Sequence, residues 1–379
     1  MKQALFALSG DPIHNGHIDI VNRAATVFDR VIIGIGMNPD KGYLFTPDER
    51  KEMARRSLER TPNVEVVGFE GLLVDYAYEQ GIRVIVKGVR NSNDFDYENI
   101  LHLVGESQEL GIDTYVLFSR PDLMHVSSTM IRALQKEEGF IHRYVPLYVK
   151  QCLEARISGQ YIVGVTGEIG TGKSQLSGVF RALGEHRKVE VHPIEMDEIG
   201  TQILEELTEP SYIRVREEVV ASFGVKVRNR DGSINRKAIG NIVYRDAERL
   251  NELNRILDRP LMVRLRRELR GKRGLILLNS GLLVESSLTH LCNNNVVLVS
   301  CDKRSQETRL RGRGLDTRQI ERRLASQYSE VEKREKIQAR IRETNQGMLW
   351  EVDASDGVPE REIARGFEAL LACFGLGEA

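Results

Sequence analysis

Short apolar runs alternate with longer amphipathic segments along the first 160 residues of the chain. The runs are rich in β-branched residues and predict strands at 4–8, 31–35, 64–67, 83–87 and 114–118. The segments between them carry apolar residues at helical spacing and predict helices near 16–28, 47–59, 71–80, 94–110, 127–137 and 146–156. Because the strands are apolar throughout and each is followed by a helix, the pattern predicts a doubly wound parallel sheet.

The pattern breaks at Ile157-Ser158-Gly159-Gln160, where the last predicted helix ends and a new strand begins. We place a domain boundary there, which gives predicted domains at 1–158 and 159–379. The second domain then becomes mainly helical after its first strand, loop and helix. Its predicted elements are strands at 161–166, 274–278 and 295–300, helices at 173–184 and about 359–373, and arginine-rich helical patterns over 304–343. The fold class expected for the whole chain is α/β, with two doubly wound parallel-sheet domains.

Composition narrows the classes of function that the chain can serve. It has 379 residues with 41% hydrophobic content, enough for two packed cores. A net charge of −1 and an aromatic content of 6% argue against a nucleic-acid binder. The sequence has no apolar run near the roughly 20 residues of a membrane span and no secretory leader. With four cysteines and no C-x-x-C pair, we expect a cytoplasmic protein with reduced thiols and without membrane or nucleic-acid partners.

The first candidate site is the segment Asp11-Pro12-Ile13-His14-Asn15-Gly16-His17, directly after the first predicted strand. A loop in that position lies at the carboxyl edge of the sheet, where ligands bind, and the helix that follows offers free N–H groups to anions. Nucleotidyl transfer needs an acceptor phosphate held in line and charge offset on the α-phosphate, which two imidazoles with a lysine and an arginine could supply. Two other interpretations are a metal pair, for which no third ligand is evident, and a helix cap formed by both histidines.

Further segments extend this motif in order along the first domain. They are Asn38-Pro39-Asp40-Lys41, Phe45-Thr46-Pro47-Asp48-Glu49-Arg50, Val64-Glu65-Val66-Val67-Gly68-Phe69, Lys87-Gly88-Val89-Arg90, Asp94-Phe95-Asp96-Tyr97-Glu98 and Ser127-Ser128-Thr129. Taken together, residues 3 to about 156 closely resemble bacterial phosphopantetheine adenylyltransferase. The resemblance implies a Rossmann-like nucleotidyltransferase fold and, because relatives of this domain form hexamers, a homo-oligomer.

The resemblance also implies catalytic roles at matching positions. His17 would contact the ATP phosphates and stabilise the transition state, Lys41 would bridge the acceptor phosphate and the α-phosphate, and Arg90 would hold the β- and γ-phosphates. Further implied ATP contacts are Ser9, Gly10, His14, Gly88, Val89, Glu98, Ser127, Ser128 and Thr129. Ser9 and Lys41 would also touch the second substrate, with Leu73 and Lys87 on its pantetheine side.

Two positions of the first domain depart from the family pattern. The family's Gly-Thr-Phe-Asp-Pro is Leu8-Ser9-Gly10-Asp11-Pro12 here, and Lys87 stands where an arginine is more usual. A lysine offers a point charge without the bidentate fork of arginine, so a phosphate contact would survive with looser geometry.

The second candidate site is Gly167-Glu168-Ile169-Gly170-Thr171-Gly172-Lys173-Ser174, which lies between a predicted strand and a predicted helix. This G-x-x-x-x-G-K-S pattern is a P-loop, in which backbone N–H groups wrap a phosphate, the lysine reaches the β/γ oxygens and the serine binds Mg²⁺. The expected ATP-binding residues are Gly170, Thr171, Gly172, Lys173, Ser174, Gln175 and Arg309, with Ser174 as metal ligand.

The surrounding sequence resembles dephospho-coenzyme A kinase over residues 161–350, more weakly than the first half resembles its family. The carriers are Val165-Thr166-Gly167 through Ser174, Asp197 after Ile194, Leu282-Leu283-Val284-Glu285, and the stretch from Arg309 to Arg318 that leads to Gln327. The resemblance implies that Asp197 accepts the proton of a ribose 3′-hydroxyl and that Arg309 and Arg313 close over the transferring phosphoryl group. Asp197 could instead cap a helix, and the arginine cluster from 304 to 323 fits either a solvated helix face or a phosphate-facing lid.

Three departures from the kinase pattern bear on activity. The arginine of the family's Asp-x-x-x-x-Arg pair falls at about Thr201, its His-Pro is Arg259-Pro260, and the proline before Leu-Leu is Gly281. Arg259 could take over phosphate binding, but a changed acceptor or a lost activity fits the same departures.

The pairing of these two sites predicts a bifunctional enzyme of coenzyme A biosynthesis that uses ATP and Mg²⁺. The first domain would join 4′-phosphopantetheine to the adenylyl group of ATP, and the second would phosphorylate the 3′-hydroxyl of the resulting dephospho-coenzyme A. Two alternatives stay open. One is an adenylyltransferase for another phosphorylated acceptor, such as a mononucleotide, paired with a nucleoside-type kinase. The other is an active adenylyltransferase whose diverged P-loop domain is a nucleotide-binding regulatory or assembly module.

Overall fold

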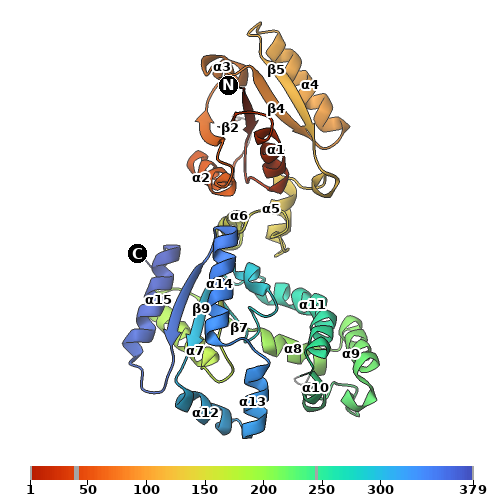
Figure 1. The fold of residues 1–379 in the computed structure, drawn as a ribbon, viewed down its shortest axis with the longest axis vertical. Helices are drawn as coiled ribbons and strands as arrows, with labels where there is room; N and C mark the ends of the chain where they lie inside the picture. The colour runs from red at the N-terminus through yellow and green to blue at the C-terminus, as the bar shows by residue number, and fades with distance from the viewer. Residues whose placement is uncertain (1, 38–41, 244–245, 378–379) are drawn as a thin grey trace. The chain divides into compact units, whose positions relative to one another are not determined.

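The computed structural model describes residues 2–37, 42–243 and 246–377 and divides into two compact units, Met1–Ile157 and Ser158–Ala379 (Figure 1). Each unit contains a five-stranded sheet whose strand pairs are all parallel. The predicted fold class of two parallel α/β sheets is confirmed. No described helix combines the length and the apolar character that crossing a bilayer requires.

The sheet of the first unit has the order β3-β2-β1-β4-β5. Its strands are β1 (Gln3–Leu8), β2 (Arg30–Gly36), β3 (Val64–Phe69), β4 (Val84–Val89) and β5 (Asp113–Phe118). Its helices are α1 (Asn15–Ala25), α2 (Pro47–Leu58), α3 (Leu73–Glu79), α4 (Ser92–Glu106), α5 (Ser128–Lys136) and α6 (Leu147–Leu153). Strand order reverses between β1 and β4, so the carboxyl ends of these two strands form the switch point where ligands bind in such sheets.

Both faces of this sheet are buried, which explains why its inner strands are apolar throughout. Ala4 and Phe6 of β1 pack into a core under α1, α2, α5 and α6, whereas Leu5 faces the other core, under α3. The helix α2 begins as its sequence predicts, because Thr46 and Glu49 form a reciprocal capping box around Pro47 at the first helical position.

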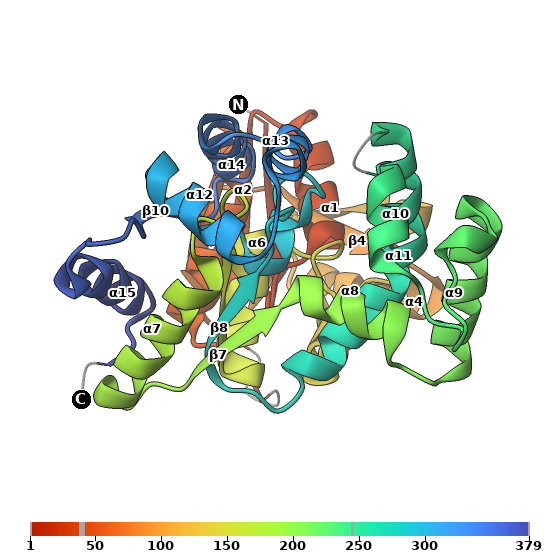
Figure 2. The ribbon, with the colours of Figure 1, turned by 90° about the horizontal axis from the view of Figure 1, so that it is seen from below.

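The sheet of the second unit has the order β10-β9-β6-β8-β7. Its strands are β6 (Gln160–Thr166), β7 (Val191–Glu195), β8 (Gly274–Asn279), β9 (Asn295–Ser300) and β10 (Met348–Asp353). Its helices are α7 (Lys173–Arg187), α8 (Met196–Glu205), α9 (Pro210–Phe223), α10 (Arg236–Val243), α11 (Ala247–Leu269), α12 (Lys303–Gly312), α13 (Thr317–Ala325), α14 (Glu330–Thr344) and α15 (Glu360–Phe374). Helices α7 and α15 lie side by side over one core of the sheet (Figure 2), and α8 to α11 pack on one another around a separate small core.

Two strands of the second unit were not predicted, and both lie at an edge of the sheet. The strand β7 contains Pro193, which deprived the segment of a strand-like pattern but is tolerated on an edge strand, where a missing N–H costs little. The strand β10 alternates buried Trp350 and Val352 with exposed Glu351 and Asp353. Its charged, half-exposed sequence resembles a loop more than the continuous apolar strands elsewhere in the sheet. The prediction that residues 184–274 are helical and contain no strand is therefore wrong, because β7 lies within them.

Candidate active sites

The first candidate site gathers three segments around the switch point of the first sheet. The loop after β1 carries Ser9 to His14, the end of β4 carries Lys87 to Arg90, and the start of α5 carries Ser127 to Thr129. These segments are held together by hydrogen bonds, since Ser128 Oγ donates to the Pro12 carbonyl at 2.8 Å and Arg90 donates to the Val126 carbonyl at 3.1 Å. The sheet topology therefore brings together residues that lie more than 100 positions apart.

His14 and His17 form a stacked pair at the start of α1. Their ring centroids are 3.6 Å apart with planes inclined by 21°. His14 Nδ1 accepts a hydrogen bond from Gly16 N at 3.1 Å, and His17 Nδ1 accepts one from His14 N at 3.4 Å. Both histidines thus cap the helix, as one of the alternatives from the sequence proposed. Because each Nδ1 is an acceptor, each ring carries its proton on Nε2, where it can serve as a donor to a ligand.

The surroundings of the two histidines keep both of them neutral. Burial and then the charge of Arg90 lower the pKa of His17 from its ordinary 6.5 to about 3. Burial, followed by the charges of His17 and Arg90, lowers the pKa of His14 still further. At neutral pH the pair can therefore donate hydrogen bonds to phosphate oxygens without gaining or losing a proton.

Arg90 is fixed by a bidentate ion pair with Asp94 in the first turn of α4. Its Nε lies 2.7 Å from Asp94 Oδ2, and its second terminal nitrogen lies 3.1 Å from Oδ1. The hydrogen bond from Arg90 lowers the pKa of Asp94. A guanidinium has five N–H donors, so this arrangement leaves others of Arg90 without a partner among the described residues and ready for an anion.

The remaining predicted residues of this site have varied surroundings. Lys87 Nζ pairs with Glu98 Oε2 at 2.8 Å, which links β4 to α4. Gly88 has a packing role, because a Cβ there would lie 2.9 Å from a side-chain carbon of Ile20 on α1. Ser127 is the N-cap of α5 and accepts from Met130 N at 3.1 Å.

Four further residues predicted for this site lie at defined places in the fold. Gly10 has a left-handed φ of 59° in the loop after β1, Val89 ends β4, Thr129 is exposed in the first turn of α5, and Leu73 begins α3. Lys41 lies outside the described residues, so its role stays a prediction.

Two arginines to which the sequence motifs assigned no role hold the loop after β1 in place by hydrogen bonds. Arg50 is fully buried, and one terminal nitrogen donates to the Ser9 carbonyl at 2.5 Å and to the Gly36 carbonyl at 3.0 Å. Arg132 lies 2.9 Å from the carboxylate of buried Asp11, which also accepts from Leu44 N and Phe45 N. The available signal was Arg50 at a core-facing position of α2, since a buried arginine needs polar partners, whereas Arg132 is only half-buried and gave no such signal.

The P-loop of the second unit adopts a conformation that requires its glycines. Gly170 and Gly172 have left-handed φ values of 85° and 95°, and a Cβ at Gly167 would lie 2.2 Å from the Val299 carbonyl. Lys173 folds back over the loop and donates to the carbonyls of Gly167 and Glu168 at 3.0 and 2.9 Å. Burial lowers the pKa of Lys173 to about 8, so the side chain is still mainly charged at neutral pH.

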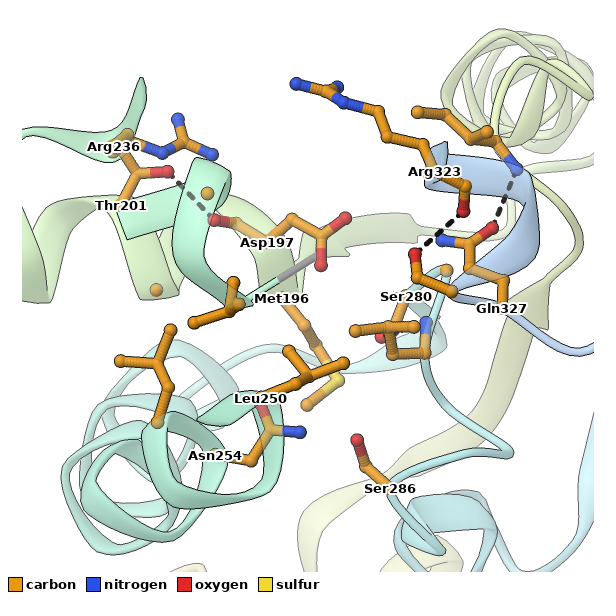
Figure 3. A pocket seen from close by; sticks show the side chains of 18 of the residues that line it. Met196, Asp197, Thr201, Arg236, Leu250, Asn254, Ser280, Ser286, Arg323 and Gln327 are labelled. Carbon is orange, nitrogen blue, oxygen red and sulfur yellow. Dashed lines mark hydrogen bonds between the residues drawn. The ribbon is translucent and has the colours of Figure 1, made fainter. Parts of the chain in front are cut away.

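A cavity of about 750 Å³ opens in front of this loop. Lys173, Ser174, Asp197, Arg313 and Gln327 are among the residues that line it, and Figure 3 shows the carboxylate of Asp197 pointing into it. Asp197 occupies the first turn of α8, whose N-cap is Glu195, so Asp197 is not the cap residue. The side chain is open to the cavity, and desolvation by the surrounding protein raises its pKa against the opposing charges of Lys173 and Arg236.

The arginine cluster divides between the cavity and the scaffold. Arg313, Arg322 and Arg323 line the cavity, which favours the phosphate-facing interpretation for this part of the cluster. Arg309 instead joins the P-loop to the residues after β10, because it donates to the Thr171 carbonyl at 3.1 Å and to Ala354 and Asp356, both at 2.6 Å.

The other predicted residues and departures of the second site also have defined positions. Thr171 is buried in the P-loop, and Gln175 is exposed in the first turn of α7. Thr201 lines the cavity and donates to the Asp197 carbonyl at 2.9 Å, and Gly281 lines it beside Lys173. Arg259 lies on α11 and is not among the described residues that line the cavity, so the alternative in which Arg259 takes over phosphate binding gains no support.

Comparisons with known proteins place a family on each half of the chain. The cytidylyltransferase-like family matches residues 9–134, and the dephospho-CoA kinase family matches residues 161–348. Phosphopantetheine adenylyltransferase of Alkaliphilus metalliredigens is 36% identical over 156 residues, which are 41% of this chain and 99% of that protein. The same enzyme of Symbiobacterium thermophilum is 45% identical over 134 residues, 35% of this chain and 83% of that protein. A solved dephospho-CoA kinase of Campylobacter jejuni is 15% identical with a TM-score of 0.35, and covers 57% of this chain and 96% of that one.

Proposed function

The chain belongs to the phosphopantetheine adenylyltransferase family and also carries a dephospho-CoA kinase domain, and we propose that it catalyses two consecutive steps of coenzyme A synthesis. The first unit transfers the adenylyl group of ATP to 4′-phosphopantetheine and releases pyrophosphate. The second unit transfers the γ-phosphoryl group of another ATP to the 3′-hydroxyl of dephospho-coenzyme A and releases ADP. The product of the first step is the acceptor of the second.

In the first step, a phosphate oxygen of 4′-phosphopantetheine attacks the α-phosphorus of ATP while the bond to pyrophosphate breaks. The protein has to align the two phosphates and offset charge on the α-phosphate oxygens. His17 would donate from Nε2 to one of these oxygens, and Arg90 would bind the departing β- and γ-phosphates. The stacked, neutral histidine pair beside a fixed arginine is the observation that carries this proposal.

In the second step, Asp197 would accept the proton of the ribose 3′-hydroxyl as its oxygen attacks the γ-phosphorus. Its pKa is raised by desolvation, which makes it a stronger base than an ordinary carboxylate. The P-loop and Lys173 would hold the β- and γ-phosphates, with Arg313 on the transferring group. Support comes from the shared cavity, because Asp197, Lys173 and Arg313 all line it.

Mg²⁺ would enter each step bound to ATP. No group of three His, Cys, Asp or Glu side chains among the described residues could hold a metal ion alone. An ion that arrives with a nucleotide needs only one or two protein oxygens, and Ser174 and Asp197 both line the cavity, so the residues of the second unit fit such an ion. Mg²⁺ would offset negative charge on the phosphates.

The first unit also supports self-association, and we expect a homo-oligomer, with a hexamer as the specific expectation. Helix α4 has no buried residue. It exposes a run of large apolar side chains, namely Phe95, Tyr97, Ile100, Leu101, Leu103 and Val104. An apolar face of this kind on a soluble unit is typical of an interface. Mass photometry of the purified protein tests this, with a lone monomer as the contrary result.

Acceptor choice in the first step separates the proposal from its main enzymatic alternative. Pyrophosphate release would be measured with ATP and either 4′-phosphopantetheine or nicotinamide mononucleotide. We expect turnover with phosphopantetheine only; turnover with the mononucleotide alone would replace the proposed substrate. The alternative of a non-catalytic second unit rests on the departures at Thr201, Arg259 and Gly281, and ATP binding without any 3′-phosphorylation would establish it.

A further inference from the structure

The second residue of the P-loop, Glu168, places a carboxylate in a loop that has to bind an anion. No motif assigns it a role, because the P-loop pattern leaves this position open. Its main-chain carbonyl accepts hydrogen bonds within the loop, from Lys173 Nζ at 2.9 Å and from Thr171 Oγ1 at 3.0 Å. Its side chain has different partners, which lie on α12 and α14.

The Glu168 carboxylate joins the P-loop to both ends of one segment. Residues 303–327 comprise α12, α13 and the turn after α13, and we call them the arginine segment. Glu168 Oε2 accepts from Gln306 Nε2 on α12 at 3.1 Å, and Oε1 accepts at 3.1 Å from Glu330 N, at the start of α14 directly after the segment. The segment contributes three arginines to the cavity lining, namely Arg313, Arg322 and Arg323.

The next residue of the P-loop, Ile169, is held by glutamines from the same two places. Buried Gln306 also donates to the Ile169 carbonyl at 2.9 Å, and Gln327 accepts from Ile169 N at 3.0 Å. Figure 3 shows Gln327 at the cavity together with Arg323. Both ends of the arginine segment are therefore fastened to two consecutive residues of the P-loop.

Positive charge outside the cavity offsets the Glu168 carboxylate. Glu330 N lies at the N-terminus of α14, where the helix dipole favours an anion. Burial lowers the pKa of Lys333 in the same helix, and the charges of Glu285 and Glu168 oppose this shift. Neither Glu168 nor Lys333 is among the described residues that line the cavity. The helix start and the ammonium group thus balance a charge that would otherwise repel the phosphates of ATP.

The arginine segment depends on such hydrogen bonds because it has little apolar core of its own. Leu310 and Ile320 are the only buried hydrophobic residues within 303–327, a range that the structure describes throughout. A segment with few buried apolar contacts opens easily unless polar contacts fix it. Cations that are already in place when a nucleotide arrives bind it more tightly, since less ordering is then required.

We propose that Glu168 is a positioning residue, which fixes the arginine segment against the P-loop so that the cavity arginines are in place before ATP binds. This inference rests on the proposed kinase function of the second unit and deepens it. Glu168 acts through Gln306 and the start of α14 and contacts no phosphate. Its loss weakens nucleotide binding and phosphoryl transfer through the arginine segment, while Lys173 and Ser174 of the P-loop stay intact.

Hydrogen exchange of the full chain without ligand tests this position independently of turnover. In Glu168→Ala we expect peptides from 303–327 to exchange about tenfold faster or more, as for the loss of a charged hydrogen bond, while peptides of β6 and β8 match wild type. Glu307→Ala is the matched control, since Glu307 is an exposed carboxylate of α12 outside the described cavity lining, and it should exchange as wild type. Unchanged exchange in 303–327, or an equal rise in β6 and β8, would overturn the proposal.

Kinetics with added dephospho-coenzyme A then show whether Glu168 acts through the arginines. Glu168→Ala should raise the KM for ATP about tenfold and leave the KM for dephospho-coenzyme A within about twofold of wild type. Glu168→Gln keeps one acceptor oxygen and should lie between the two. In the triple variant Arg313→Ala, Arg322→Ala, Arg323→Ala, the further change Glu168→Ala should add less than about twofold, and a full additional loss would overturn the proposal.

Failure of the kinase function is distinguishable from failure of this inference. If wild type forms no coenzyme A from added dephospho-coenzyme A and ATP, the kinase function fails. The exchange measurement then decides the role of Glu168 by itself, with faster exchange confined to the arginine segment in its favour and any other pattern against it.

Discussion

The imidazole rings of His14 and His17 stack 3.6 Å apart, and each Nδ1 accepts a backbone N–H at the start of α1. One pair of side chains thus begins a helix through its Nδ1 atoms and keeps an Nε2 donor on each ring. The capping and the catalytic interpretations of this motif are therefore compatible, because they use different nitrogens of the same rings.

The lowered pKa of these histidines predicts an acid-sensitive first unit. In the unfolded chain both regain a pKa near 6.5, so between about pH 3 and 6.5 the unfolded state binds more protons than the folded state. Their contribution to stability is complete above this window and falls as the pH drops through it, by up to about 1.4 kcal/mol per pH unit for each histidine. Hydrogen exchange of β1 and β4 peptides at several pH values measures this loss.

A double variant, His14→Asn with His17→Asn, is the control for this dependence. Asparagine caps helices well and does not titrate, so its stability should fall less between pH 6.5 and 4.5 than that of wild type. An equal fall in both proteins would show that the histidines are not the cause.

Asp94 is expected to act on ATP binding through Arg90. In Asp94→Asn the bidentate partner of Arg90 loses its charge, so the guanidinium is no longer held beside the switch point. We expect the KM for ATP in adenylyl transfer to rise about tenfold, with a smaller effect on the KM for phosphopantetheine. Asp96→Asn, an exposed position of the same helix, serves as the control and should behave as wild type. Equal kinetics for the two variants would remove Asp94 from the site.

Asp197 should determine the acid limb of the kinase pH profile. Because its pKa is raised, kcat should decline as the pH falls through that value and the carboxylate becomes protonated. Asp197→Asn should lower kcat by about 10²- to 10⁴-fold and flatten this limb. Glu198→Gln changes the neighbouring exposed carboxylate, which does not line the cavity, and should retain the wild-type profile. A variant at Asp197 that keeps the acid limb would exclude it as the base.

Buried Lys333 links α14 to the segment after β8, part of which lines the cavity. Its Nζ lies 2.6 and 2.8 Å from the two oxygens of Glu285 and 2.7 Å from the Gly281 carbonyl. Lys333→Met leaves the carboxylate of Glu285 without its partner, and we expect a loss of about 3–5 kcal/mol in the free energy of unfolding. The single tryptophan, Trp350, is buried in this unit and reports its unfolding by fluorescence.

Two further variants test whether the loss in unfolding free energy at Lys333 comes from its buried ion pair. Lys333→Met combined with Glu285→Leu should recover most of the loss, since no unpaired charge then stays buried. Arg340→Ala breaks an exposed pair with Glu343 and should cost less than about 1 kcal/mol. A loss at Lys333 as small as that at Arg340 would contradict the structural role of the buried pair.

The continuous apolar strands and the glycine-rich loops made much of this fold predictable from the sequence. Local patterns sufficed where a strand is buried on both faces, as in β1 or β9, and failed at the edge strands β7 and β10, whose sequences are proline-containing or half-polar. Motifs identified the residues for which we propose ligand contacts through the main chain or a terminal charge.

The residues that position the sites could be recognised only from the tertiary structure. Arg50 on α2 donates to the Ser9 carbonyl in the loop after β1, and the charge of Arg236 acts on Asp197 because the loop before α10 is hydrogen-bonded to the end of α8. Neither contact has a spacing that a sequence pattern could reveal. The roles of His17, Arg90, Lys173 and Asp197 stay predictions until the variants are measured.

Mass spectrometry of the products formed from 4′-phosphopantetheine, ATP and Mg²⁺ tests most directly whether one chain runs both steps. Wild type should form dephospho-coenzyme A and then coenzyme A. His17→Ala should form neither from phosphopantetheine but still convert added dephospho-coenzyme A, whereas Lys173→Ala should stop at dephospho-coenzyme A. A wild-type reaction that ends at dephospho-coenzyme A would contradict the second step, and one that yields neither product would contradict the whole assignment.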